Sequence, residues 1–160
     1  MNVRENELTG PIPKELGQLT NNNLLLLNDN KLTGTLPTEI GQVTNLLLFS
    51  LTSNFLIGTL PTEIGFLTSL LLFHLIDNEL TGSLPTEIGN LKTVLNFDAS
   101  YNHFKLPTEM WFLTSLISLG LSDNKLTGTL PTEIGNLKKV GFLDASLNHF
   151  NRHFLLKLDS

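Results

Sequence analysis

The sequence predicts an α/β solenoid, a fold in which near-identical coils of the chain stack on one another. Two observations predict this fold class: an asparagine recurs at almost constant spacing, and apolar residues recur at fixed distances from it. A period between about 20 and 50 residues is typical of solenoids. The steps between successive asparagines are 24, 24, 24, 24, 22 and 24 residues. The asparagines are Asn6, Asn30, Asn54, Asn78, Asn102, Asn124 and Asn148.

This periodicity predicts one domain over residues 1–160. We expect a partial first coil at residues 1–21, about six further coils, and an atypical C-terminal segment at residues 151–160. Each coil alone is too small to bury its apolar side chains, so stacking on neighbouring coils has to supply the core.

The residues before each asparagine predict a short β-strand. Apolar residues stand five and three positions before it, as Phe73 and Leu75 do before Asn78. Residues spaced by two lie on one face of a strand, and neighbouring strands stack about 4.8 Å apart in a parallel sheet. An inward asparagine amide can satisfy both an N–H and a C=O group of the turning backbone. We therefore expect a buried structural ladder of Asn30, Asn54, Asn78, Asn102, Asn124 and Asn148.

The residues after each asparagine predict a tight connection followed by a short helical turn. The motif Leu-Thr-Gly-x-Leu/Ile-Pro recurs, for example at residues 32–37 and 80–85. Glycine permits a backbone conformation that would strain other residues. The following Pro-Thr-Glu-Ile-Gly suits a helical turn, because proline is tolerated in a first turn, glutamate favours a helix N-terminus and glycine ends helices.

Two places depart from the pattern. The coil between Asn102 and Asn124 is two residues short and carries Trp111 where other coils have glycine. We expect a local irregularity there, which would be the least stable part of the array. The aromatic rings are either exposed or fill the space left by the two missing residues. The second alternative is favoured, because aromatic area is usually buried. At the ends, we expect residues 151–160 to cap the last coil. The first strand edge is open to self-association unless further repeats precede it.

With these motifs in register over about residues 1 to 150, the chain resembles the plant-type subfamily of leucine-rich repeats. That subfamily includes the extracellular parts of receptor-like kinases and the polygalacturonase-inhibiting proteins. The resemblance implies a right-handed leucine-rich repeat solenoid, with a concave parallel β-sheet, short helical turns on the convex side and a second short strand at the Thr-Gly-x-Leu segment. It also implies binding of peptides, hormones or other proteins, and no enzymatic activity.

Composition argues against several classes of function. Charged residues make up 16% of the chain and the formal net charge is −5, whereas nucleic-acid binders carry clustered Lys and Arg. No apolar run is long enough to span a bilayer, and no basic amphipathic stretch is present to bind a membrane surface. The absence of cysteine excludes disulfides and thiolate metal sites. We expect no metal, no cofactor and no catalytic residue, because no nucleophile has a recognisable base partner.

The compartment is left open by the sequence. Residues 1–6 are polar and show no signal peptide, the chain has no cysteine, and no Asn-x-Ser/Thr sequon occurs. These features are typical of a cytoplasmic protein or of an excised fragment of a larger one.

The outward-facing residues of the predicted strands form the candidate binding surface. Adjacent leucines in the N-terminal half predict an apolar patch, which usually marks an interaction site. Aspartates without Lys or Arg favour a basic partner. We therefore expect a protein or peptide ligand with apolar and cationic groups; the alternative is copying of a leucine-rich template, with aspartate as a solvated strand-end residue. The candidates are Leu24, Leu26, Asp29, Leu47, Leu48, Leu71, Leu72, His74, Asp77, Asn96, Asp98, Tyr101, Asp123, Phe142 and Asp144.

Two other functions are compatible with the repeats. One is a purely structural fragment of a larger receptor. The other is ice binding, because regular threonine ladders on a solenoid can match an ice lattice and some plant-type leucine-rich repeat proteins are antifreezes. The alternative for the threonines is that they start helical turns, where threonine is favoured. The complete row is Thr38, Thr62, Thr86, Thr108 and Thr132, and the interrupted row is Thr35, Thr59, Ser83 and Thr129.

Overall fold

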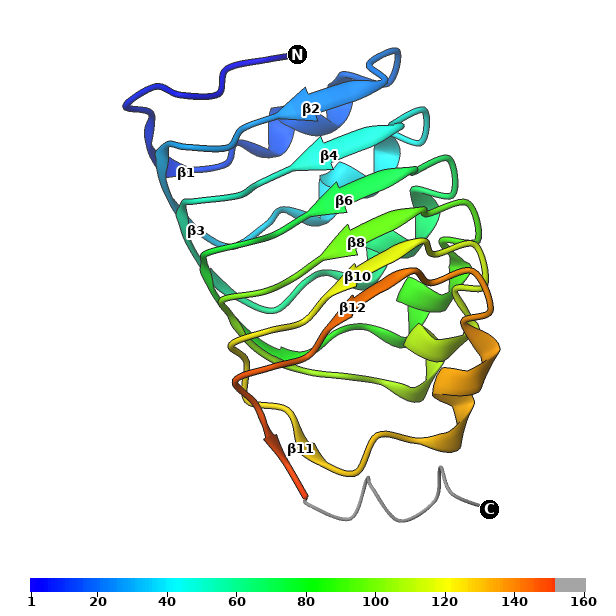
Figure 1. The fold of residues 1–160 in the computed structure, drawn as a ribbon. Helices are drawn as coiled ribbons and strands as arrows, with labels where there is room; N and C mark the ends of the chain where they lie inside the picture. The colour runs from blue at the N-terminus through cyan, green and yellow to red at the C-terminus, as the bar shows by residue number, and fades with distance from the viewer. Residues whose placement is uncertain (152–160) are drawn as a thin grey trace, which may run out of the picture.

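The computed structural model describes residues 1–151 as a stack of coils, each of which contributes a strand to a six-stranded parallel sheet (Figure 1). We call this the main sheet and its outward side the concave face. Its strand order along the stack is the order of the coils in the sequence. The strands are β2 (Leu24–Leu26), β4 (Leu48–Ser50), β6 (Leu72–His74), β8 (Asn96–Asp98), β10 (Ser118–Gly120) and β12 (Phe142–Asp144).

A second set of strands, the side sheet, contains the Thr-Gly motifs. Five of its strands pair in parallel from β1 to β9, and β11 and β13 pair separately. The second strand implied by the family resemblance is therefore present. The strands are β1 (Thr9–Pro11), β3 (Lys31–Gly34), β5 (Phe55–Gly58), β7 (Glu79–Ser83), β9 (His103–Lys105), β11 (Thr127–Gly128) and β13 (His149–Phe150).

The helical turns are 3-10 helices of five residues, and each is preceded by its proline as N-cap. The predicted turns are thus confirmed. The proline was expected inside the first turn, but it lies one position earlier, as the residue that precedes the turn. Within residues 1–151, no helix is long and apolar enough to cross a membrane. The helices are η1 (Lys14–Gln18), η2 (Thr38–Gln42), η3 (Thr62–Phe66), η4 (Thr86–Asn90), η5 (Thr108–Phe112) and η6 (Thr132–Asn136).

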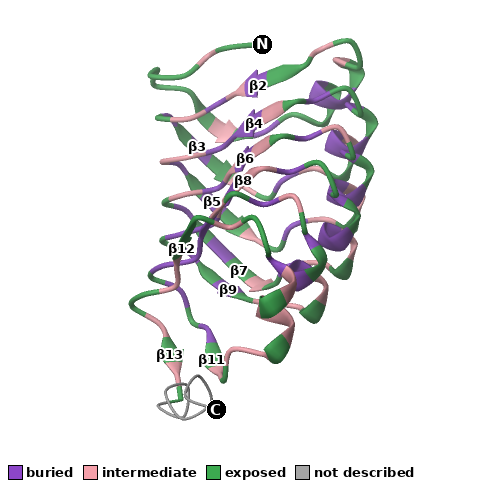
Figure 2. Cartoon of the chain, turned by 45° about the vertical axis from the view of Figure 1, so that its right-hand side comes forward, coloured by how far each residue is buried: buried purple, intermediate pink, exposed green. Residues whose placement is uncertain are grey.

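The core lies between the two sheets and the helices (Figure 2). The residues five positions before the ladder asparagines lie in the middle of the main-sheet strands, and they are buried in every strand except β12, where Leu143 is 40% exposed. Phe49, Phe73 and Phe97 form a column there, with ring centroids 5.5 Å and 5.4 Å apart. These distances allow favourable contact between aromatic rings. The column continues from one coil to the next and ties the central strands together.

The ladder asparagines from Asn30 to Asn124 are buried, Asn148 is half-buried, and all of them form hydrogen bonds across coils. The amide of Asn78 donates to the carbonyls of Leu51 at 3.0 Å and Leu75 at 3.2 Å, and its oxygen accepts the N–H of Leu56 at 3.1 Å. Asn30, Asn54, Asn102, Asn124 and Asn148 make the equivalent three bonds in their own coils. No buried side-chain nitrogen or oxygen of the described chain lacks a partner.

The first residues of the chain run beside β2. Val3 N–H donates to Leu26 O at 3.0 Å, and Leu26 N–H donates to Met1 O at 3.1 Å. Residues 1–6 therefore cover the edge of β2, and self-association through an uncapped N-terminal edge stays a prediction. The predicted cap falls on residues 152–160, which lie outside the described part of the chain.

The short coil accommodates its two aromatic residues differently. Trp111 is only 2% exposed, which agrees with the prediction that a ring fills the space left by the missing residues. Phe112, the next residue, is 45% exposed on the convex side. The strand pairing of the side sheet stops directly after this coil, between β9 and β11.

Candidate functional site

Two columns of side chains line the concave face, because residues on either side of a buried strand position point outward. The pairing of the main-sheet strands puts equivalent residues of successive coils next to one another. The first column is Leu24, Leu48, Leu72, Asn96, Ser118 and Phe142. The second column is Leu26, Ser50, His74, Asp98, Gly120 and Asp144.

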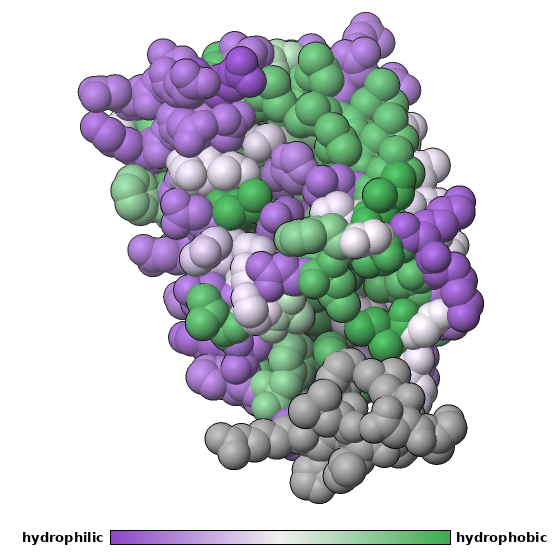
Figure 3. Space-filling view, viewed as in Figure 1, coloured by the Kyte–Doolittle hydropathy of each residue, from purple (hydrophilic) through white to green (hydrophobic). Residues whose placement is uncertain are grey.

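An apolar border runs along the starts of these strands. The predicted residues Leu47 and Leu71 are 39% and 37% exposed, immediately before β4 and β6. Two further members, Leu95 and Ile117, were not among the sequence candidates, and Ile117 is 52% exposed. The sequence could have identified both residues, because each lies seven positions before its ladder asparagine, as Leu47 and Leu71 do. Figure 3 shows apolar side chains gathered over the strand starts and hydrophilic ones where the strands end.

The face becomes acidic toward its C-terminal half. Asp98 and Asp144 both pair in register with Gly120, which lies between them. A Cβ atom added at Gly120 would collide with the Asp98 carboxylate, so the glycine gives that side chain its room. Backbone N–H groups of Ser100 and Ser146 donate to Asp98 and Asp144 at 2.9 Å and 3.0 Å.

Serine hydrogen bonds also act on the charge of Asp144. The side chain of Ser146, followed by its backbone N–H, holds the pKa of Asp144 below the usual range of an aspartate, and Ser122 adds to this. Partial burial opposes the shift. The net effect keeps Asp144 ionised, so the outward carboxylate presents a full negative charge at neutral pH.

Four predicted residues lie at turns and not on the strands. Asp29, Asp77, Tyr101 and Asp123 have φ of 57°, 58°, 56° and 49°. Aspartate adopts this left-handed conformation more readily than most residues. Asp29 and Asp77 line a hollow of about 390 Å³ at the turn edge, together with the exposed ring of Phe55. The aspartates thus divide into two on the concave strands and three at the rim.

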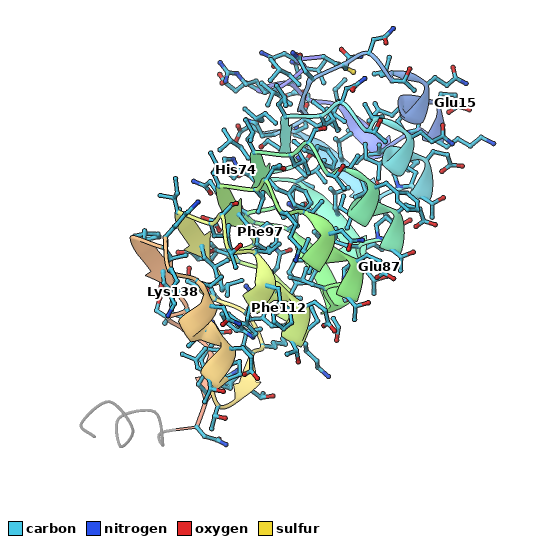
Figure 4. The ribbon with its side chains drawn as sticks, turned by 90° about the vertical axis from the view of Figure 1, so that its right-hand side faces the viewer. Glu15, His74, Glu87, Phe97, Phe112 and Lys138 are labelled. Atoms are coloured by element: carbon cyan, nitrogen blue, oxygen red, sulfur yellow. The ribbon has the colours of Figure 1, made fainter. Side chains whose placement is uncertain are left out.

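The helices present charge on the side away from the main sheet. Figure 4 shows His74 on the side of the concave face, with Glu15 and Glu87 projecting from the helices on the opposite side. The threonines of the complete row are engaged with this glutamate row: the hydroxyls of Thr38, Thr62, Thr86 and Thr132 donate to the adjacent glutamates at 3.1 to 3.3 Å. The resulting surface alternates hydroxyl and carboxylate groups.

The geometry of the concave face suits an extended ligand. Six strands about 4.8 Å apart span about 24 Å, the length of about seven extended residues. No group of three or more His, Asp or Glu side chains in residues 1–151 is arranged to hold a metal ion. What the face offers chemically is apolar contact area on β2, β4 and β6, and at the other end two carboxylates beside the exposed ring of Phe142.

Comparison with known proteins places this geometry in a family. The leucine-rich repeat family model matches residues 115–137. The fold is similar to that of the plant peptide hormone receptor RGFR1 in complex with RGF2, with a TM-score of 0.91 and 33% identity over 94% of this chain and 24% of that chain. It is also similar to the Arabidopsis receptor kinase HAESA in complex with the peptide hormone IDA and the co-receptor SERK1, with a TM-score of 0.88 and 32% identity over 93% and 25% of the two chains.

A third similar structure has a different function. A plant ice-binding protein matches with a TM-score of 0.83 and 30% identity, over 92% of this chain and 48% of that chain. This chain therefore spans less than half the length of each of the three proteins. No sequence among the curated proteins matches it. Repeats, sheets and matches together show that the chain is a leucine-rich repeat protein, a class that is typically non-catalytic, and that its fold is that of plant receptor-kinase ectodomains.

Proposed function

We propose that the chain is a non-catalytic recognition module that binds an extended peptide or protein segment on its concave face. The observation that carries this proposal is the gradient along that face, from leucines on β2, β4 and β6 to carboxylates on β8 and β12. The likeness to RGFR1 and HAESA, whose structures contain peptide ligands, supports the same function.

The gradient defines the chemistry of the ligand. Leu24, Leu48 and Leu72 adjoin in register and favour apolar side chains. Asp98 and Asp144 favour a Lys or Arg side chain, and the Asp98 carboxylate lies over Gly120, on the side of Asp144. A ligand of about seven extended residues would therefore place its apolar half over β2 to β6 and its cationic half over β8 to β12.

A random-peptide display library, selected on the full chain, tests the proposal without a known ligand. We expect enrichment of peptides that combine apolar residues with Lys or Arg. Binding of the selected peptides should be lost with Leu48→Glu and with Asp98→Lys. The control is Phe66→Glu, which changes a 60% exposed residue on the convex side and should leave binding unchanged. Selected peptides that bind all three variants equally well would exclude the concave face.

Ice binding is the second candidate, and the likeness to a plant ice-binding protein favours it. The threonine rows are less regular than an ice lattice requires, because the second row is interrupted at the short coil and the first is bonded to glutamates. Thermal hysteresis of the purified chain separates the candidates. Hysteresis that is lost with Thr62→Leu but kept with Asp98→Lys would favour ice binding over peptide recognition.

A further inference from the structure

One strand of the side sheet presents apolar residues where the others present polar ones. In β5 the outward-facing residues are Phe55 and Ile57, and the inward Leu56 lies buried between them. Phe55 is 54% exposed and Ile57 is 46% exposed. The fold does not require apolar side chains at these two positions, because the equivalent residues of the other coils are polar. Those residues, one and three positions after each ladder asparagine, are Lys31, Thr33, Glu79, Thr81, His103, Lys105, Lys125, Thr127, His149 and Asn151.

Phe55 and Ile57 have polar neighbours on both sides. Phe55 pairs in register with Thr33 of β3, and Ile57 pairs with Glu79 of β7. The exposure of the two apolar side chains shows that no residue of the described chain covers them. Adjoining apolar side chains that the fold does not require are typical of a surface that contacts another molecule.

The hollow of about 390 Å³ at the turn edge lies beside the ring of Phe55. Its lining extends over three successive coils, because Asp29, Ser53 and Asp77 each stand directly before a ladder asparagine. Asp29 and Asp77 are two coils apart, which corresponds to about 10 Å. Serine is the smallest residue found directly before any ladder asparagine, so Ser53 leaves room for a ligand between the two aspartates.

The charge around this hollow is negative. Asp29, Asp77 and Glu79 line it, and all three residues are exposed. None of the three forms a salt bridge with another described residue. Lys31 of the neighbouring β3 pairs with Glu7 of the preceding coil, with 3.5 Å between Nζ and Oε1. A ligand with a cationic group therefore complements both the hollow and the apolar residues of β5.

We propose that the outward face of β5 and this hollow form a second binding site, which docks a partner protein through an arginine and a nearby apolar side chain. The guanidinium group would enter the hollow between Asp29 and Asp77, with one face against the ring of Phe55. The apolar side chain of the partner would cover Ile57. Arginine is favoured over lysine, because its planar group stacks on aromatic rings and binds carboxylates through two parallel hydrogen bonds.

The probe is the capped tripeptide Leu-Gly-Arg, whose two side chains have the same two-residue spacing as Phe55 and Ile57. The comparison peptide has citrulline in place of arginine, which keeps nearly the same shape and removes the charge. Binding to the full chain is followed by the NMR shifts of the Ser53 and Phe55 amides, because this method detects weak complexes. We expect saturable shifts with the arginine peptide, and at least about ten-fold weaker binding of the citrulline peptide. Added salt should weaken binding of the arginine peptide.

Two substitutions locate the site. Asp77→Asn removes one charge but keeps a residue that adopts positive φ readily, so the turn should be preserved. It should weaken binding of the arginine peptide at least about ten-fold. Phe55→Lys introduces the residue that Lys31 provides at the same position of its own coil, so the fold should accept it. This variant should abolish the shift of the Ser53 amide, because it removes the ring and adds a like charge.

The matched controls are Asp123→Asn, at a turn that does not line the hollow, and Asp98→Lys on the concave face. Both should leave the shifts of the Ser53 and Phe55 amides unchanged, and their persistence in Asp98→Lys separates this site from the concave face. Three results would overturn the proposal. They are the absence of a saturable shift at both amides, equal binding of the citrulline peptide, and an affinity for Asp77→Asn that is no lower than that for Asp123→Asn.

Discussion

At the scale of single residues, the ladder asparagine connects two successive coils through one side chain. Asn78 bonds to Leu51 and Leu56 of the preceding coil and to Leu75 of its own. We predict that Asn78→Ala lowers the free energy of unfolding by about 1–3 kcal/mol, because it leaves buried backbone groups without partners. Urea denaturation, analysed at constant m-value, measures the loss.

The matched control is the first asparagine of the series. Asn6 is exposed, and its side chain bonds only within its own turn, to Val3 O and Arg4 O. Asn6→Ala should therefore cost clearly less than Asn78→Ala. Equal losses would mean that burial of the ladder does not set its contribution to stability.

The glycine at the fourth position of every 3-10 turn except η5 gives a second residue-scale prediction. A Cβ at Gly65 would lie 2.8 Å from the backbone oxygen of Glu87, while one at Gly135 meets no atom within 4 Å. Gly65→Ala should destabilise the protein by about 1–3 kcal/mol through overpacking. Gly135→Ala should be neutral, or stabilising by less than about 1 kcal/mol, because the unfolded chain loses entropy. Melting temperatures that fall equally in both variants would contradict this packing.

The charge of Asp144 gives a prediction about pH. Because its pKa is lowered, the stabilising contribution of the carboxylate is fully present above the ordinary aspartate pKa, and is lost as the pH falls through the lowered value. Ser146→Ala removes the largest cause and should raise the pKa of Asp144 part of the way back. Ser122→Ala should raise it less. NMR titration of the Asp144 carboxyl carbon measures both, and an unchanged midpoint in Ser146→Ala would refute this assignment.

The aspartates show what sequence could and could not predict about the candidate site. In the sequence, five aspartates form one acidic strip. In the structure, Asp29, Asp77 and Asp123 occupy turn positions of positive φ, where the backbone itself favours aspartate. Only Asp98 and Asp144 lie on the concave strands. Backbone preference and ligand preference select the same residue type, so a single sequence cannot separate them.

At the scale of elements, the 24-residue repeat was sufficient to predict the strands, the turns and the inward asparagines. Nearly every coil has the same types of residue at the same positions, so each folds in the same way. Trp111 was the main exception. Its burial was predicted, but the interruption of the side sheet and the hollow beside it were not. Both depend on how far apart two successive coils lie, and that spacing is set by three-dimensional packing and not by any residue pattern within a coil.

The two aromatic residues of the short coil give a prediction at this scale. Trp111→Ala should cost about 3–5 kcal/mol, because a buried indole is replaced by a cavity in the wall between η5 and η6. Phe112→Ala, at the exposed neighbouring residue, should cost less than about 1 kcal/mol. Chemical denaturation followed by far-UV circular dichroism compares them. A larger loss for Phe112→Ala would show that the tryptophan is not the residue that packs this coil.

At the scale of the whole molecule, the concave face and the side sheet around β9 and β11 differ in the sign of their charge. The concave face carries Asp98 and Asp144, whereas Lys105 and Lys125 lie beside the break in the side sheet. Because each coil contacts only its neighbours, a ligand on the concave face should leave most of the side sheet unchanged.

The central claim is that the carboxylates of the concave face recognise a cationic group of an extended ligand, and a reciprocal charge exchange tests it most directly. The dissociation constant of a selected Arg-containing peptide is measured on the unchanged chain and on Asp98→Lys, and then again with Glu replacing the arginine of the peptide. Each single exchange should weaken binding by at least about ten-fold, or 1.4 kcal/mol, and the double exchange should restore most of it. Losses that simply add, with no recovery in the double exchange, would contradict the account.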